Sequence, residues 1–510
     1  MDSQLINTIF GMKIRQARTE ARMTLTELAA ECDLSPSYLT EVEKGRKYPR
    51  ADKIIRMASA LKKNYDELVS ITLAPSLADL ETALASPLLH QIPFEEFGFT
   101  FSDLIDLLTR VPDRASALLH AILDVARQFN LKEENFLLAI LRSYQEINDN
   151  HFPEIEEMAA RFAKDFKLES EMPITLARLE EILHRDFSIR LDTESLMPQG
   201  LLGIYRSIFV KGGKSKLLLN PDLSSTERRF CIAREIGYLV LGLNERAYTS
   251  SRNEVRSFSQ VLNDFKASYF AAALLLPKAA LLADLNEFFA LPTWQPEYLL
   301  ALLDKYDVTP EVLLYRFSEL IPQYFGLKMH FLRVREAESS NSKLRYRLVK
   351  QLNMNRLLLP SGLALDEHFC RRWLVVELLR ELRNLEEKNA EGIKPVGKEP
   401  KPIVGIQLSE FFHSHDRFLC FGFARSSLLP KESNSSMIVG FRVDTEFYQT
   451  VRFASDPTIP FVIINETCER CPLSNEQCPQ RAAPPTVLQN QTIHAQRQQA
   501  LAQLLAQLQG

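Results

Sequence analysis

Three cysteines near the C-terminus stand at a spacing that could bind a metal. Cys468, Cys471 and Cys478 lie in TCERCPLSNEQCPQR as Cys-x2-Cys-x6-Cys, with proline after the last two of them. Three thiolates on one irregular loop can bind a soft metal ion or an iron–sulfur cluster. Because zinc needs four ligands and no fourth is adjacent, we expect a cluster rather than zinc. Free, redox-active thiols are the alternative. The candidates for a fourth ligand are Cys420, His413 and His415.

The seven cysteines together do not predict a disulfide framework. The chain begins MDSQLINTIF, without the basic and apolar regions of a secretory signal, so we expect it in the cytoplasm, where thiols stay reduced. The longest apolar run ends at Pro277, well short of the ~20 residues that cross a bilayer, so no membrane is expected as a partner. The other cysteines have apolar neighbours and are expected to be small buried side chains: Cys32, Cys231, Cys370 and Cys420.

A second group of polar residues lies on a helix expected at 224–242. The helix begins with a capping box from Ser224 to Glu227 and ends at Gly242. Its segment AREIGYLVL resembles the place where IrrE-like metallopeptidases carry a zinc-binding helix, His-Glu-x-x-His. FKASYFAAALLLP at 265–277 resembles a later block of that family, which helps to supply a carboxylate ligand. The resemblance covers about residues 153–325 and implies a degenerate zincin-like α+β domain.

The residues that a zinc peptidase requires are replaced in this helix. Zinc needs two neutral imidazoles four residues apart, and the sequence has Arg234 and Tyr238 there. A guanidinium keeps its proton and would repel the metal. Glu235 then has no metal-bound water to activate, and Lys266 near the third-ligand position points the same way. We therefore expect that the chain is not an enzyme. The alternative is a proteolytic switch that cleaves a partner repressor.

A lost active site leaves a pocket that could bind a ligand. Cations and aromatic rings in this region would together suit a small anionic molecule. For each of these side chains, the alternative is that it only fills or caps the domain. The expected ligand-binding residues are Arg228, Arg229, Arg234, Tyr238 and Tyr269.

Residues 24–45 have the pattern of a helix-turn-helix. A first helix carrying Leu28 is followed by a turn at Asp33, and Ser35 caps a second helix with Pro36 at its first position. The exposed start of that helix would face the major groove of double-stranded DNA. The whole chain has a formal charge of -4, but six basic residues oppose one acid in 44–56, a patch that can neutralise phosphates. The expected DNA-binding residues are Ser35, Pro36, Ser37, Tyr38, Thr40, Glu41, Lys44, Arg46, Lys47 and Arg50.

Residues 10–68 resemble the Cro and lambda-repressor-like regulators of the Xre type. The resemblance rests on Phe10-Gly11, Thr24, Glu27-Leu28-Ala29, Ser35-x-x-Tyr38-Leu39 and Glu43-x-Gly45. It implies a five-helix DNA-binding domain. Leu25 departs from the pattern, because the family often has there a Gln that touches a phosphate. A helical interaction module of the same fold that does not meet DNA is the alternative.

The length of the chain predicts several domains around these residues. A chain of 510 residues is too long for one core. We expect a multidomain, mainly α protein. Its elements should include a β-hairpin at Gly212-Gly213, helices at 225–242 and 260–285, and strands beyond 325. A C-terminal helix with a leucine stripe should pack on its own domain or on a partner. The expected parts are a lambda-repressor-like helix-turn-helix domain at 1–70, a helical connector at 71–152, the zincin-like domain at 153–325 and an α+β sensor domain at 326–510.

The order of these parts resembles the short-chain fatty acid regulators, a family that includes regulators of propionate and acetate metabolism. The segment NHFPEIE at 150–156 and the cysteine cluster ending in CPQRAAPP add to the resemblance. It implies transcription regulation in response to a small anionic metabolite such as a short-chain acyl-CoA, and an iron–sulfur cluster that reports redox or iron state. One helix-turn-helix reads few base pairs, so we expect a homo-oligomer, a dimer that places two helix-turn-helix domains on symmetric half-sites.

Overall fold

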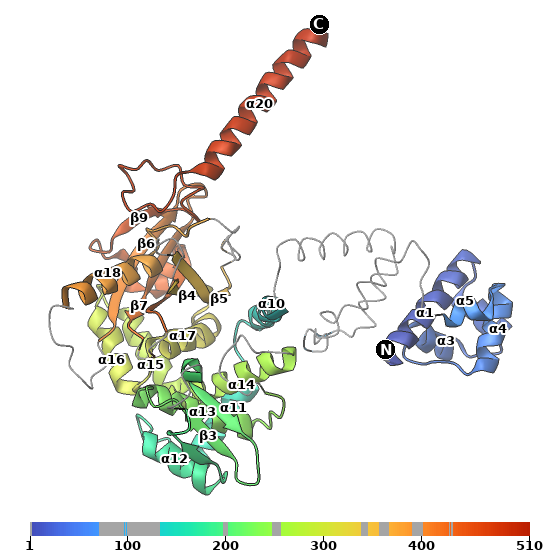
Figure 1. Ribbon diagram of the computed structural model, residues 1–510, viewed down its shortest axis with the longest axis horizontal. Coiled ribbons are helices and arrows are strands. Elements are labelled where there is room, and N and C mark those ends of the chain that lie inside the picture. The colour runs from blue at the N-terminus through green and yellow to red at the C-terminus, as the bar shows by residue number, and fades with distance from the viewer. Residues whose placement is uncertain are drawn as a thin grey trace. The chain divides into compact units, whose positions relative to one another are not determined.

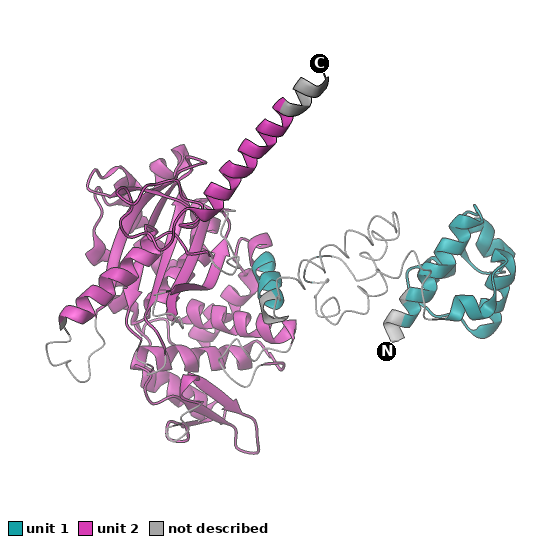
Figure 2. Ribbon diagram, turned by 45° about the horizontal axis from the view of Figure 1, so that its top comes forward, with its two compact units in different colours: residues 1–144 teal, residues 145–510 magenta. Residues whose placement is uncertain are grey.

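A computed structural model describes residues 3–70, 133–196, 202–246, 257–337, 345–355, 367–389, 401–427 and 432–509, with a few isolated positions besides. The chain divides into two compact units, Met1–Tyr144 and Gln145–Gly510, which Figure 2 shows in different colours. The connector predicted at 71–152 lies mostly outside the described residues. The described part of it starts with helix α10 (Glu133–Ile147).

The N-terminal unit contains the five predicted helices of the helix-turn-helix domain. They are α1 (Ser3–Glu20), α2 (Leu25–Glu31), α3 (Pro36–Glu43), α4 (Ala51–Leu61) and α5 (Tyr65–Val69). Local signals set their bounds: Thr24 and Glu27 form a capping box, and the Ser35 hydroxyl accepts a hydrogen bond from the Tyr38 amide. Asp33 takes the left-handed conformation expected at the turn, with φ of 55°. Leu28, Leu39 and Val42 are buried in one shared core.

The second unit begins with helices and a small sheet. Helices α11 (Pro153–Asp165) and α12 (Leu176–Arg185) precede strands β1 (Arg190–Asp192), β2 (Ser207–Val210) and β3 (Lys216–Leu219). Strands β2 and β3 are antiparallel, which confirms the predicted hairpin, and β1 pairs with β3 in parallel. Helix α13 (Ser225–Val240) follows with its predicted capping box.

The helix predicted at 260–285 is two helices in the structure. Helices α14 (Phe258–Leu275) and α15 (Lys278–Ala290) are separated at Pro277, which cannot continue the hydrogen bonds of α14. Helices α16 (Pro296–Tyr306) and α17 (Pro310–Phe325) complete this part. Among the described residues no single helix is long and apolar enough to cross a membrane, whereas α14 and α15 together pass that test by length and composition but are bent by 71°.

A six-stranded sheet forms the centre of the C-terminal part. Its strands are β4 (Met329–Ala337), β5 (Arg345–Asn353), β6 (Ile403–Phe411), β7 (Arg417–Arg425), β8 (Ser435–Arg442) and β9 (Phe461–Ile464), in the order β5-β4-β8-β7-β6-β9. Neighbours are antiparallel except β6 and β9. Helix α18 (Leu374–Asn389) packs on the sheet (Figure 1). The prediction of a mainly α protein was therefore only partly right, because a six-stranded sheet forms the centre of the C-terminal part.

The two faces of the sheet are covered by different helices. Cys420 on β7 belongs to the core that contains Leu374 and other residues of α18. Its neighbour Phe421 points to the opposite face, since side chains alternate along a strand. There its ring lies 5.6 Å from that of Phe288 on α15 and 5.8 Å from that of Trp294. The sheet is thus sandwiched between α18 and the preceding helical part.

Buried ion pairs join that helical part to the sheet. Glu227 at the start of α13 accepts hydrogen bonds from Arg206 at 2.9 Å and from Arg425 of β7 at 2.7 Å. Arg206 also reaches Glu432 at 3.0 Å. These pairs explain why residues 145–510 form one compact unit although they contain both predicted regions, 153–325 and 326–510.

Helix α20 (Thr486–Gln509) stands away from the sheet region in Figure 1. The helix itself was predicted. Residues 489–503 are all exposed, so this part of the helix does not pack on its own domain. Short helices α19 (Thr445–Thr450) and η5 (Arg452–Ser455) lie between β8 and β9, and η3 (Leu202–Ile204) precedes β2.

Candidate functional site

Helix α3 presents an exposed N-terminal end. Ser35, Pro36 and Ser37 are exposed, and Thr40 and Glu41 are partly exposed, whereas Leu39 and Val42 of the same helix point into the core. The Thr40 hydroxyl donates to the Pro36 carbonyl at 2.8 Å, so it is oriented by the helix itself. This is the arrangement in which the first turns of a recognition helix can meet base edges.

Tyr38 has a supporting position in this surface. It is half-buried and packs against the core of the domain. The Lys53 ammonium lies 3.9 Å from the centre of its ring and that of Lys47 lies 5.7 Å away, which are cation–π contacts. The ring therefore holds two cations near the recognition helix, and its own part in binding DNA stays a prediction.

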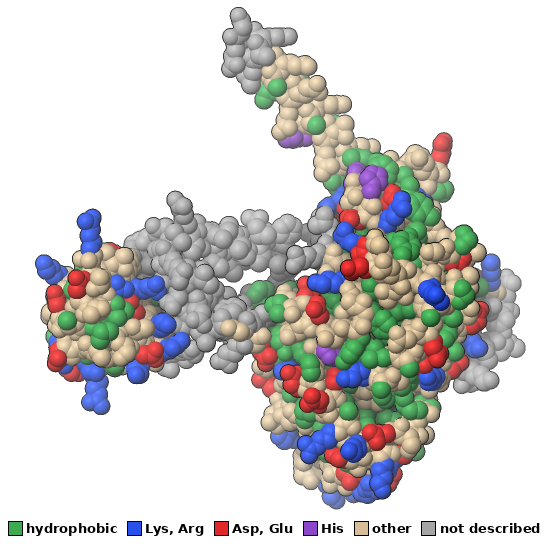
Figure 3. Space-filling view, turned by 180° about the vertical axis from the view of Figure 1, so that it is seen from behind, with side chains coloured by type: hydrophobic (Ala, Val, Ile, Leu, Met, Phe, Trp, Pro, Cys, Tyr) green, Lys and Arg blue, Asp and Glu red, His purple; other side chains and the backbone are tan. Residues whose placement is uncertain are grey.

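The basic charges predicted after α3 differ in their surroundings. Arg46, Lys47 and Arg50 are exposed, and Arg46 has only a long contact with Glu41, at 3.4 Å. Arg56, in contrast, contacts both Asp33 at 3.4 Å and Asp52 at 3.3 Å, so part of its charge is compensated. Lys44 is partly exposed. Figure 3 shows Lys and Arg side chains standing out on several sides of this unit, with acidic side chains among them.

An ion pair that the sequence did not predict holds α3 against α1. Arg18 of α1 donates to both carboxylate oxygens of Glu43, at 2.6 and 2.9 Å, and also to the Met23 carbonyl. Nearby, Gly11 lets α1 approach α3, because a Cβ there would stand 2.3 Å from the Val42 carbonyl oxygen. Both features fix the orientation of the recognition helix.

In the IrrE-like region, the two side chains that replace the expected zinc-binding histidines contact one carboxylate. Arg234 donates to Asp264 of α14 at 3.3 Å and to the Ser207 hydroxyl at 2.9 Å. The Tyr238 hydroxyl lies 3.4 Å from the same Asp264 oxygen. The carboxylate opposite these two positions is therefore Asp264, two residues before Lys266, which we had placed near the third ligand.

Glu235, at the position of the general base, is also held in an ion pair. Its two oxygens accept hydrogen bonds from Arg246 at 2.6 and 2.8 Å. The Arg246 guanidinium lies 3.5 Å from the centre of the Phe209 ring and 4.8 Å from that of Tyr238. Burial raises the pKa of Glu235 and the charge of Arg246 opposes that rise. A stacked cation thus covers the carboxylate that a peptidase would use to activate water.

The other predicted ligand-binding residues also have partners inside the domain. Arg228 donates to the Pro221 carbonyl at 2.6 Å, and Arg229 pairs with Asp307. The Tyr269 hydroxyl donates to Glu156 at 2.7 Å. That carboxylate accepts two more bonds from the fully buried Arg316, at 2.6 and 2.9 Å. The role of these residues in ligand binding stays a prediction, and the contacts show what each side chain does within the fold.

The three clustered cysteines lie on one buried loop before α20. Cys471 and Cys478 pack with Leu473 in a small core, and Cys468 is also buried. The Cys468 sulfur accepts a hydrogen bond from the Ala482 amide at 3.4 Å. Arg481 closes the loop by donating to main-chain carbonyls of Cys468 at 2.9 Å and Cys471 at 3.2 Å.

The structure brings a fourth cysteine, Cys370, to this loop. Phe369 pairs with Thr467 in an antiparallel bridge, so Cys370 and Cys468 lie diagonally on the opposite side of the two strands from that pair. Burial raises the pKa of the Cys370 thiol to about 12, and the nearby charges of Cys468 and Cys471 add to the rise. We had expected Cys370 to be an ordinary buried side chain. No signal in its local sequence indicates this neighbourhood.

The four thiols supply the donor set for a soft metal, but they do not form a ready-made coordination shell. Within the ranges that the structure describes, no group of three or more His, Cys, Asp or Glu side chains is placed to hold a metal ion. Cys420 contacts His330 inside the sheet instead, at 3.8 Å, and His415 follows β6, where it contacts Glu410. Of the fourth ligands proposed from the sequence, Cys420 and His415 thus have other partners, whereas Cys370 lies beside the loop.

Comparison with known families finds two matching regions. Residues 14–68 match the family described as helix-turn-helix, and residues 187–318 match the family described as IrrE N-terminal-like domain. Both matches lie inside the ranges predicted for these domains. The N-terminal region is also 34% identical, over 68 residues, to the control protein C.BamHI of Bacillus amyloliquefaciens, and covers 84% of that protein and 13% of this chain.

Two solved structures are similar over most of their own length. A Mycobacterium tuberculosis transcriptional regulator is 16% identical with a TM-score of 0.45, over 68% of this chain and 93% of the other. The apo form of the competence regulator ComR from Streptococcus vestibularis is 16% identical with a TM-score of 0.12, over 63% and 87%. Scores of this size carry no argument about the present fold.

Proposed function

Since its N-terminal domain belongs to the helix-turn-helix family of DNA-binding transcription regulators, we propose that this chain is a sequence-specific regulator whose residues 145–510 sense a signal. The family match and the similarity to a control protein identify a transcription regulator rather than an enzyme. The observation that carries the finer proposal is the exposed N-terminal end of α3, followed by exposed cations. Polar side chains there can read bases while the cations bind phosphates.

The reading of DNA can be tested by selecting binding sites from a random duplex library with the full chain. We expect one preferred sequence, with half-sites related by symmetry. Ser37→Ala should change which bases are preferred, because Ser37 stands exposed in the first turn of α3. Ser59→Ala, on the exposed surface of α4, is the matched control and should leave the preference unchanged. Recovery of no preferred sequence by the parent protein would contradict sequence-specific binding.

The IrrE-like region is proposed to serve the regulator as a sensor of an anionic metabolite such as a short-chain acyl-CoA. The replacement of the zinc ligands supports a role other than hydrolysis, because Arg234 pairs with the carboxylate that remains. Titration of short-chain acyl-CoA thioesters into the complex of protein and selected operator tests the proposal. We expect the DNA affinity to change at saturating effector, and unchanged affinity with every acyl chain would refute this effector class.

The cysteine loop is proposed to hold an iron–sulfur cluster, with zinc as the alternative. Cys468, Cys471 and Cys478 would be ligands, and Cys370 the fourth. A bound cluster would supply one-electron redox chemistry or sensitivity to iron. The chain's own part is to bury the thiols and to fix the loop through Arg481.

Metal content measures this proposal directly. The parent protein, purified without oxygen, should contain iron and sulfide, and Cys471→Ser and Cys370→Ser should each lose them. Cys231→Ser, at a buried cysteine of α13, should keep them. Zinc in place of iron would select the alternative, whereas equal metal content in all four proteins would refute a site at this loop.

We also propose that the chain is a homo-oligomer that assembles in part through α20. Residues 489–503 of this helix are exposed, and the sequence places leucines at 501, 504, 505 and 508, which is the spacing of one helical face. Light scattering should give the mass of a dimer for the full chain and the mass of a monomer when residues 489–510 are removed. A monomeric full chain would refute the assembly.

A further inference from the structure

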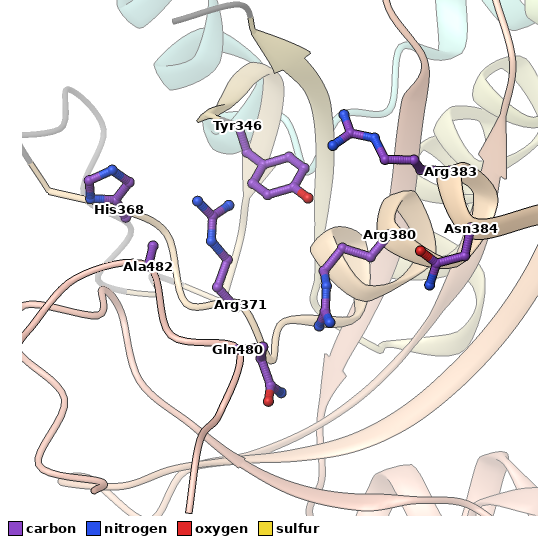
Figure 4. Close-up of a pocket in the computed structure, with 8 residues that line it drawn as sticks. All are labelled: Tyr346, His368, Arg371, Arg380, Arg383, Asn384, Gln480 and Ala482. Atoms are coloured by element: carbon purple, nitrogen blue, oxygen red, sulfur yellow. The ribbon is translucent and has the colours of Figure 1, made fainter. Parts of the chain in front are cut away.

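A cavity of about 400 Å³ lies between α18 and the cysteine loop (Figure 4). We propose that it binds a small molecule that carries phosphate groups. The side chains that could contact such a molecule are Arg371, Arg380, Arg383, Tyr346, Asn384 and Gln480. Of the described residues that line the cavity, none is Asp or Glu. The inference rests on the proposed function in that the occupant would be a second signal of the regulator, besides the metabolite proposed for the IrrE-like region.

Two of the guanidinium groups come from one face of α18. Arg380 and Arg383 stand three residues apart and therefore project from the same side of the helix. Arg380 pairs with Glu377 at 2.7 Å and Arg383 with Glu336 at 2.8 Å. Each has five N–H donors, so these pairs orient the side chains and leave donors for a ligand. About a third of each side chain is exposed.

Arg371 provides a cation deeper in the structure. It is 8% exposed, and its guanidinium carbon lies 4.4 Å from the centre of the Tyr346 ring. In Figure 4 its side chain points toward that ring and lies between His368 and Arg380. A guanidinium that stacks by its face can also donate from its edge to two oxygens of one phosphate group.

The size and composition of the cavity define the class of ligand. A volume of about 400 Å³ is in the range of small-molecule sites, and a duplex does not fit into it. Three guanidinium groups favour a ligand with more than one negative charge, such as a diphosphate. The side-chain amides of Asn384 and Gln480 can bind polar groups of the uncharged part.

One wall of the cavity belongs to the cysteine loop. Gln480 and Ala482 line the cavity on either side of Arg481, whose guanidinium binds carbonyls of the loop. The Ala482 amide donates to the Cys468 sulfur at 3.4 Å. A metal bound at the cysteines that shifted this wall would change the affinity for the ligand, and by linkage the ligand would change the affinity for the metal by the same factor.

Calorimetric titration of the full chain with sodium pyrophosphate tests the site at constant ionic strength. We expect one pyrophosphate per chain. R380Q/R383Q should bind it at least tenfold more weakly, because each lost charge-assisted hydrogen bond is worth about a factor of ten or more. Arg442→Gln is the matched control: its side chain is 49% exposed and pairs with Asp416 away from the cavity. It should bind like the parent protein.

Two further measurements separate a lost site from a damaged fold. R371K keeps the charge but not the planar fork, so it should weaken pyrophosphate binding while its thermal unfolding stays close to that of the parent. Sodium sulfate should bind at least tenfold more weakly than pyrophosphate. Equal binding of both anions, or an equal loss in the Arg442→Gln control, would overturn the proposal, because either result indicates unspecific attraction of anions.

Operator binding, measured on the same proteins, distinguishes this inference from the proposed function. If the parent binds its operator but not pyrophosphate, the inference fails and the regulator stands. If pyrophosphate binds and R380Q/R383Q prevents it without any effect of pyrophosphate on operator affinity, the site is confirmed and its role as the sensor fails.

Discussion

Replacing Arg46 and Lys47 by alanine should weaken DNA binding at every sequence and make it less sensitive to salt. Both side chains follow the recognition helix and are exposed, and the contact of Arg46 with Glu41 is long, at 3.4 Å. Such cations are free to meet phosphates, which position a protein on DNA without reading bases. The pair of substitutions leaves the core of the domain untouched, because neither residue belongs to it.

The size of the effect follows from counterion release. Each phosphate contact contributes about 0.9 to the slope of log affinity against log salt concentration, so the loss of two should reduce the slope by about 1.8. Between about 50 and 200 mM salt, the parent should therefore lose roughly tenfold more affinity than the variant. The difference between the two proteins is largest at low salt, where the phosphate contacts are strongest.

Fluorescence anisotropy with a labelled operator and an unrelated duplex, at a series of salt concentrations, measures both quantities. Lys63→Ala is the control, since Lys63 contacts Glu20 of α1 at 3.1 Å and Glu67 of α5 at 3.8 Å rather than lying beside α3. An unchanged slope with lost affinity only at the operator would mean that the two residues read bases. Unchanged slope and affinity would place the phosphate contacts elsewhere.

Three further predictions concern the rest of the fold. R234H/Y238H should give the chain a zinc site with Asp264, because two imidazoles four residues apart would face a carboxylate now paired with Arg234. After dialysis the variant should hold about one zinc per chain more than the parent. Zinc that stays at the parent level would show that these positions do not converge. Burial raises the pKa of Glu319 to about 8, so its contribution to stability is present below its unfolded pKa of ~4.3 and is lost as the pH rises through 8. The unfolding temperature of Glu319→Gln should therefore decrease less between about pH 5 and 8 than that of the parent protein. An equally steep decrease in both proteins would contradict a raised pKa for Glu319. Gly11→Ala should destabilise the N-terminal domain by about 2–3 kcal/mol, since its Cβ would stand 2.3 Å from a carbonyl oxygen of α3. Thermal unfolding and operator binding of the full chain measure this loss. The control is Ala30→Gly at an exposed position of α2, which should cost only about 1 kcal/mol.

The helix-turn-helix domain could be predicted in detail because its signals are local. Thr24 and Ser35 cap their own helices, Asp33 accepts a left-handed turn, and Pro36 starts α3, all within a few residues of the structure that they determine. The capping box of α13 and the β2–β3 hairpin were predicted for the same reason. The sequence also contains Pro277, within the single helix that was predicted at 260–285. Only the structure shows that α14 ends before this proline and that α15 begins after it.

By itself the sequence also determined that the two imidazoles of the resembled zinc helix are replaced, since Arg234 and Tyr238 stand at their positions and cannot act as imidazole ligands. Only the tertiary structure decided what stands in place of that chemistry: Asp264 opposite Arg234, and Arg246 against Glu235. It alone placed Cys370 beside the cysteine loop and α18 beside a cationic cavity. The physical reason is that such contacts join segments far apart in the chain, and their positions depend on the pairing of strands and the packing of helices rather than on neighbouring residues.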